Sequence, residues 1–138
     1  MKILAALDIS DEGKSVLAKS VELAKQQGAE LILFSVAENF NAYGDYLETA
    51  HVGEKLLAAA EKGLKQAQAD AKAMGIEAKT AVETAQSPAD SIIEFATANG
   101  ADLIVLGHRS KKGLDRFLVG SVASKVVSHA PCSVMVVR

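Results

Sequence analysis

The sequence predicts an α/β fold: an open, doubly wound, five-stranded parallel sheet with strand order 3-2-1-4-5 and helices on both faces. Five short apolar runs alternate with four segments of helical periodicity along the 138 residues, a pattern typical of a parallel sheet covered on both sides. Because crossovers between parallel strands are right-handed, few strand orders remain, and 3-2-1-4-5 is favoured. The length fits one domain, residues 1–138.

The predicted strands are short runs in which apolar residues occupy both faces. They cover residues 2–7 (KILAAL), 31–36 (LILFSV), 79–82, 103–106 (LIVL) and Ser133–Val137 (SVMVV). The third run is the weakest, because only two of its four residues are apolar. The fifth run lies at an edge of the sheet in the predicted order.

The predicted helices are segments in which apolar residues recur every three or four positions. Their apolar positions are Leu17, Val21 and Ala24; Leu56, Ala60, Leu64, Ala67, Ala71 and Met74; Ile92, Ile93 and Ala96; and Ala123, Val126, Val127 and Ala130. Each segment is followed by a residue that ends a helix: Gly28, Gly75, Gly100 and Pro131, in order. Pro88 suits the first turn of the third helix.

The strand order places a ligand site between the first and fourth strands, where the direction of winding reverses. The first strand delivers Asp8 to this crevice, and the fourth delivers Gly107. The segment from Gly107 to Ser121, GHRSKKGLDRFLVGS, then leads into the fourth helix. Gly120 and Ser121 are expected to cap that helix, whose first N–H groups lack partners. Such a loop and helix start predict an anion site.

Composition and motifs narrow the function classes. The net charge is only −2, no apolar run has transmembrane length, and one cysteine, Cys132, allows no internal disulfide. We therefore expect a cytoplasmic protein without nucleic-acid or membrane partners. No GxGxxG follows the first strand, and Walker, HxxH and CxxC patterns are missing from the sequence. A dinucleotide site, a Walker phosphate loop and a dedicated metal site are not predicted.

Three segments of the chain resemble the universal stress protein family over essentially its whole length. They are KILAALDIS near the start, SPADSIIEFATANGADLIVLG, and the closing GSVASKVVSHAPCSVMVVR. The family's ATP-binding branch carries Gly-x2-Gly-x9-Gly-[Ser/Thr], which falls here on Gly107, Ser110, Gly120 and Ser121. The second glycine is therefore replaced by Ser110, whose effect on the loop depends on the sign of its φ angle.

The resemblance implies an adenine nucleotide as ligand: ATP first, with AMP or cyclic AMP as alternatives. The implied binding residues are Ala6, Asp8, Val36, Leu106, Gly107, Ser110, Gly120, Ser121 and Val122. Arg109 is a further candidate because its charge would attract phosphate, although a solvated basic loop explains it equally well. Asp8 matches an acidic position beside the nucleoside, but it also suits a turn or cap before the first helix. Mg²⁺ is expected only through the phosphates, since no carboxylate cage is evident. No catalytic residue is assigned.

The family also implies a homodimer formed through the edge strand Ser133–Val137, which would cover an otherwise exposed apolar strand. The segment from Glu38 to Ala50 (ENFNAYGDYLETA) is expected to be a lid, a dimer contact or a surface loop. Three functions follow from these observations. The first is a nucleotide-binding stress-response module, the second a nucleotide-free dimerisation module, and the third a slow ATPase or autophosphorylating protein.

Overall fold

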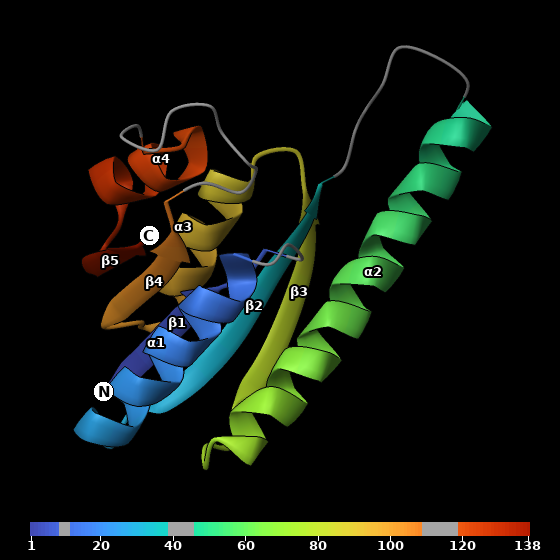
Figure 1. Ribbon diagram of the computed structural model, residues 1–138. Helices are drawn as coiled ribbons and strands as arrows, with labels where there is room; N and C mark the ends of the chain where they lie inside the picture. Colours follow the sequence, from blue (N-terminus) through green and yellow to red (C-terminus); the bar gives the residue numbers. More distant parts are fainter. Residues whose placement is uncertain (9–11, 39–45, 109–118) are drawn as a thin grey trace.

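The computed structural model describes residues 1–8, 12–38, 46–108 and 119–138. Over these residues strands and helices alternate strictly (Figure 1). The strands are β1 (Lys2–Ala6), β2 (Glu30–Glu38), β3 (Lys79–Ala85), β4 (Leu103–Gly107) and β5 (Ser133–Val137), and the helices are α1 (Glu12–Gln27), α2 (Tyr46–Ala73), α3 (Pro88–Asn99) and α4 (Ser121–His129).

All neighbouring strands are parallel, and their order is β3-β2-β1-β4-β5. The predicted order 3-2-1-4-5 is confirmed. β1 lies at the centre, where its residues pair with β2 on one side and with β4 on the other. The crossovers therefore run outward in both directions from the β1–β4 boundary, which is the switch point of the sheet.

Two hydrophobic cores cover the two faces of the sheet, as Figure 1 shows for the helices that pack there. On one face, Val16 of α1 and Leu64 of α2 pack with Leu33 of β2. On the other face, Ile92 of α3 and Val126 of α4 pack with Phe34. Residues adjacent along β2 thus serve opposite cores, because side chains alternate along a strand.

Five strand boundaries differ from those predicted, three of them by one residue each. β2 begins at Glu30 and β4 ends at Gly107. β1 ends at Ala6 rather than residue 7, although the Leu7 amide still donates to the Phe34 carbonyl at 2.7 Å. β2 and β3 continue to Glu38 and Ala85. Both extensions contain polar residues, which a search for apolar runs does not select, but which the exposed end of a strand accommodates.

The segment from Glu38 to Ala50 is only partly a loop. α2 begins at Tyr46, so the last five residues of that segment are helical, while residues 39–45 lie outside the described residues. Within the described residues, no helix combines the length and the apolar character that crossing a membrane requires. Even the long α2 carries charged residues throughout.

Candidate functional site

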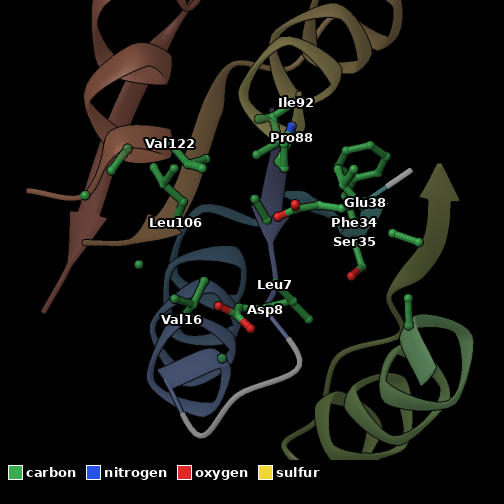
Figure 2. Close-up of a pocket in the computed structure, with 18 of the residues that line it drawn as sticks. Leu7, Asp8, Val16, Phe34, Ser35, Glu38, Pro88, Ile92, Leu106 and Val122 are labelled. Carbon is green, nitrogen blue, oxygen red and sulfur yellow. The ribbon is translucent and has the colours of Figure 1, made fainter. Parts of the chain in front are cut away.

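A cavity of about 370 Å³ opens at the carboxyl ends of β1, β2 and β4, at the switch point of the sheet. This volume lies in the range of small-molecule sites. Its walls come from seven elements and their connections (Figure 2): Ala6, Leu7, Asp8, Gly13, Val16, Phe34, Ser35, Val36, Ala37, Glu38, Leu56, Ala60, Pro88, Ile92, Leu106, Gly107, His108, Gly120, Ser121, Val122 and Ala123.

Most residues that the sequence places at the site lie in this one cavity. They are Ala6, Asp8, Val36, Leu106, Gly107, Gly120, Ser121 and Val122. The other two, Arg109 and Ser110, lie outside the described residues. These eight residues come from three strand ends and the start of α4. The topology brings them together although more than a hundred sequence positions separate Ala6 from Val122.

The start of α4 forms one rim of the cavity. Gly120 occupies the N-cap position with extended backbone angles (φ −63°, ψ 163°), and no side chain caps the helix there. Ser121 is the first helical residue, so its expected share in the cap is wrong: an extended Gly120 already fills that position. The amides of residues 121–123 precede the first intrahelical bond, from the Ser124 amide to the Gly120 carbonyl at 2.9 Å.

Two hydrogen bonds link this rim to the end of β4 and the end of β4 to β5. The Gly120 amide donates to the His108 carbonyl at 2.6 Å, and the His108 amide donates to the Val137 carbonyl at 2.9 Å. The carboxyl end of β4 is therefore joined both to the beginning of α4 and to the last residue of β5. This arrangement fixes the N-terminus of α4 beside the strand ends that line the cavity.

Asp8 lies at the opposite rim, where β1 leads towards α1. A β-carbon on Gly13 would overlap the Asp8 carbonyl oxygen, so only glycine allows the first turn of α1 to approach this carbonyl. Asp8 precedes the first helical residue, Glu12, by four positions, which separates it from the cap position of α1. Its side chain lines the cavity instead.

The cavity carries charge of opposite sign at its two ends. The carboxylates of Asp8 and Glu38 belong to the β1 and β2 ends, and Figure 2 shows both pointing into the opening. At the α4 end, the helix dipole places partial positive charge at the free amides. A ligand with an anionic end and a hydrogen-bond-donating end would match this distribution.

Sequence reasoning missed much of the wall. Glu38 was missed because β2 is longer than predicted, and Pro88 and Ile92 because helical periodicity explains them without a site. Leu56 and Ala60 of α2 were assigned to a helix face only, and Val16 of α1 was not among the apolar positions selected for the first helix. Glu38 lies two residues after Val36, the predicted end of the strand, and so falls on the same face. Continuing the two-residue alternation by one step would have found it.

Among the described residues, no group of three or more histidine, cysteine, aspartate or glutamate side chains could hold a metal ion.

The doubly wound parallel sheet and the cavity at its switch point, with a helix N-terminus at the rim, define a nucleotide-binding-like α/β fold. The model of the universal stress protein family matches residues 1–138. The chain belongs to this family.

Individual relatives agree with this assignment. A universal stress protein of Methanocaldococcus jannaschii is 33% identical over 139 residues, covering 99% of this chain and 81% of the relative. The structure of the universal stress protein UspA from Lactobacillus plantarum superposes with a TM-score of 0.84 at 30% identity, covering 100% of this chain and 97% of that one.

Two further solved structures contain ligands. A universal stress protein in complex with cAMP gives a TM-score of 0.76 at 22% identity and covers 100% of this chain and 97% of its own. The universal stress protein from Archaeoglobus fulgidus in complex with dAMP gives a TM-score of 0.70 at 24% identity, with 100% and 98% coverage. At these identities the likeness to this chain is one of fold.

Proposed function

We propose that this protein binds an adenine nucleotide, with ATP as the first candidate, and acts as a cytoplasmic homodimeric regulatory module in a stress response. The 138 residues would form one domain for this purpose. The observation that carries the proposal is the meeting of three strand ends and the α4 N-terminus around one cavity. Each end of that cavity suits a different part of a nucleotide.

The α4 end suits the phosphates. Amides of residues 121–123 lack helical partners, and the Ser121 hydroxyl adds a donor at the same rim. Gly107 and Gly120 carry no side chain that would keep an oxyanion away from the main chain. Arg109 and Ser110, outside the described residues, are proposed as further phosphate contacts, and a Mg²⁺ ion would be held through the phosphates themselves.

The strand end suits the nucleoside. Val36, Leu106 and Ile92 provide apolar surface for a base, and Ala6 and Val122 complete this wall. β1 pairs with β2 only as far as the hydrogen bond from the Leu7 amide to the Phe34 carbonyl. Because β2 continues to Glu38, the main chain of Val36 extends past the end of β1. A base edge can bond there in the manner of a neighbouring strand.

The two carboxylates set the orientation of the ligand. Asp8 and Glu38 can accept hydrogen bonds from ribose hydroxyls or an exocyclic amine, whereas they would repel phosphates. The phosphates therefore belong at α4 and the nucleoside at β1 and β2. Relatives in complex with cAMP and dAMP support adenine as the base, because both compounds carry adenine.

Hydrolysis is proposed to be weak at most. The acidic side chains that line the described cavity, Asp8 and Glu38, come from the nucleoside end rather than from the α4 rim. A general base for attack on a γ-phosphate would have to stand within hydrogen-bond reach of the attacking water. We therefore assign binding, and not turnover, as the activity of this site.

Calorimetry of the full chain with ATP, AMP and cyclic AMP tests the proposal, with GTP as the control for the base. Ser121→Ala should weaken ATP binding by roughly three- to tenfold because one phosphate donor is lost. Ser124→Ala, an exposed serine on the same helix, should leave the affinity unchanged. Asp8→Asn should weaken all three adenine ligands together by about tenfold.

If none of the adenine nucleotides bound, the protein would be a nucleotide-free dimerisation module. Turnover of ATP that Asp8→Asn abolished would instead indicate an enzyme.

The homodimer is proposed to form through β5. This strand lies at the edge of the sheet, and its four apolar residues after Ser133 are only half-buried. An exposed apolar edge strand is an aggregation hazard unless a partner strand covers it. Pairing of β5 with its copy would complete the sheet across a twofold axis.

A further inference from the structure

The cavity continues onto the second face of the sheet, between β2 and the helices α1 and α2. Five lining residues form this part, which we call the α2-side lobe: Val16, Ser35, Ala37, Leu56 and Ala60. The alternation along β2 separates it from the proposed nucleotide end, since Leu33 packs with α1 and α2 whereas Phe34 and Val36 pack with α3 and α4. Ser35 and Ala37 share the face of Leu33.

Small side chains create the lobe. Deeper on the same face, Leu64 of α2 packs into the core with Leu31 and Leu33 of β2. Towards the carboxyl end of the strand these large residues give way to Ser35 and Ala37, opposite Ala60 on α2. The helix continues past the strand ends (Figure 1), and the small side chains of Ser35, Ala37 and Ala60 leave a space that Val16 and Leu56 border.

Ser35 is the polar group of this lobe, and its hydroxyl has no hydrogen-bond partner among the described residues. Three polar side chains are buried in the described part of the chain, with exposed fractions of 0% for Ser20, 5% for Ser35 and 3% for Ser91. The Ser20 hydroxyl donates to the Val16 carbonyl at 2.7 Å, and Ser91 donates to Glu83 at 2.8 Å. No described residue accepts from or donates to the Ser35 hydroxyl, although leaving such a group unpaired is unfavourable.

The Ser35 side chain is aimed into the lobe. Figure 2 shows its hydroxyl on the side of β2 away from Phe34 and Glu38, towards α2. The four other residues of the lobe are apolar. A single water molecule would find only one side-chain partner there, whereas buried waters usually make about three hydrogen bonds.

We propose that the α2-side lobe is a second binding subsite, which takes a neutral organic molecule with an apolar body and one hydroxyl or carbonyl group. The apolar body contacts Val16, Leu56 and Ala60, and its polar atom pairs with the Ser35 hydroxyl. The ligand is neutral because the five lobe residues carry no charge, and the carboxylates of Asp8 and Glu38 elsewhere in the cavity would repel an anion. The subsite lies beside the proposed nucleotide site and does not depend on it.

Benzyl alcohol and toluene are suitable probes, since they differ only by the hydroxyl group. In methyl NMR spectra of the full chain, benzyl alcohol should shift the signals of Val16 and Leu56. Ser35→Ala should weaken benzyl alcohol binding by roughly three- to tenfold because one hydrogen bond is lost. The same variant should bind toluene within twofold of the wild type.

A second test of the subsite fills the lobe with a larger side chain. Ala60→Leu should abolish the shifts caused by both probes, whereas Ala58→Leu, at an exposed position of the same helix, should preserve them. AMP added to the wild-type protein reports separately on the proposed function through the methyl signals of Ile92 and Val122, and should not displace the probes. If AMP left those signals unmoved while benzyl alcohol bound, the proposed function alone would fail.

Three results would overturn the subsite: absence of shifts at Val16 and Leu56, equal affinity of wild type and Ser35→Ala for benzyl alcohol, or displacement of the probe by AMP. The last would assign the lobe to the nucleotide's own site.

Discussion

Gly13 and Ser35 contribute to the cavity through small size rather than through a charged group. Gly13 lets α1 begin directly against the main chain of Asp8, and Ser35 leaves space that a larger residue would occupy. In a sequence both residues look unremarkable, because neither belongs to a motif. Their roles depend on which atoms lie opposite them.

Replacement of Gly13 by alanine should damage both the site and the fold. The added methyl group would overlap the Asp8 carbonyl oxygen, a main-chain atom, so the turn after β1 must shift and carry the Asp8 side chain with it. We expect the free energy of unfolding to fall by about 1–3 kcal/mol, and nucleotide affinity to fall at least tenfold. Denaturant unfolding and calorimetry measure the two effects.

Gly53→Ala is the matched control for this substitution. Gly53 lies within α2, and apart from its own helix backbone and chain neighbours no described atom lies within 4 Å of a β-carbon built there. Alanine should therefore stabilise the protein by roughly 0.5–1 kcal/mol through helix propensity. If Gly13→Ala unfolded and bound nucleotide as the wild type does, the close approach of α1 to Asp8 would be wrong.

At the scale of elements, α3 and α4 are joined by one ion pair near the ends that face the cavity. The Lys125 ammonium lies 2.8 Å from Asp90 Oδ1, and the Asp90 amide donates to the Ser87 hydroxyl at 3.3 Å, which caps α3. Pro88 and Ile92 of α3 and residues 121–123 of α4 line the cavity. The ion pair therefore helps to fix the positions of α3 and α4, two walls of the cavity, relative to each other.

The Asp90–Lys125 pair should make stability depend on pH in the acid range. The hydrogen bond from Lys125, with a smaller contribution from Ser87, holds the pKa of Asp90 below its ordinary value of 3.8. A carboxyl group whose pKa is lower in the folded state contributes stability above its unfolded pKa, and this is lost as the pH falls through the folded pKa. The unfolded chain then binds the proton more readily.

Lys125→Gln should flatten that dependence. The slope of unfolding free energy against pH, measured between about pH 5 and pH 2, should be smaller in the variant than in the wild type. The effect should be small, since both side chains are exposed. Lys62→Gln, an exposed lysine on α2, should keep the wild-type slope, and identical slopes in all three proteins would contradict the role of the pair.

The strands and helices also show which parts of the fold can be predicted from the sequence. β1, β2, β4 and β5 were predicted because buried parallel strands consist of nearly continuous apolar runs, such as LIVL in β4. β3 is an edge strand, where Glu83 and Thr84 are exposed, so its apolar pattern stops before the strand does. The start of α2 was missed because the pattern of Leu56 and Ala60 begins later than the helix.

The site was predicted unevenly for a related reason. Asp8, Gly107 and Ser121 follow from topology and from a glycine–serine helix start, which are properties of the sequence order. The α2-side lobe depends on the volumes of side chains from three different elements that meet only in the folded protein. A periodicity argument assigns Ala60 to the core correctly, but it cannot tell that the space beside it remains open.

At the scale of the whole molecule, the edge strand and the cavity are connected. His108 donates to Val137 at the end of β5 and accepts from Gly120 at the start of α4. A ligand that repositions the α4 rim would therefore act on the last residue of the proposed dimer strand through two hydrogen bonds. This connection would link the proposed nucleotide site directly to the proposed dimer strand.

Val134→Pro should separate the dimer without breaking the sheet. The Val137 carbonyl accepts from the amide of His108, the residue after β4, so the main-chain groups of Val137 face β4. Main-chain groups of alternate residues point the same way, so those of Met135 also face β4, whereas those of Val134 face the open edge. Proline at position 134 removes an outward N–H that the β4 pairing does not use. Light scattering should give the mass of one 14.4 kDa chain for the variant and twice that mass for the wild type.

Val134→Thr keeps the outward N–H and should remain dimeric, which separates main-chain pairing from the loss of an apolar side chain. Unfolding curves of Val134→Pro should still show a cooperative transition, because the β4–β5 hydrogen bonds are retained. A wild-type protein that scattered as a single chain, or a proline variant that stayed dimeric, would place the partner surface elsewhere than β5. Calorimetry of the monomeric variant would then measure how much the nucleotide site depends on dimerisation, since the Val137–His108 bond that links the two is present in each chain.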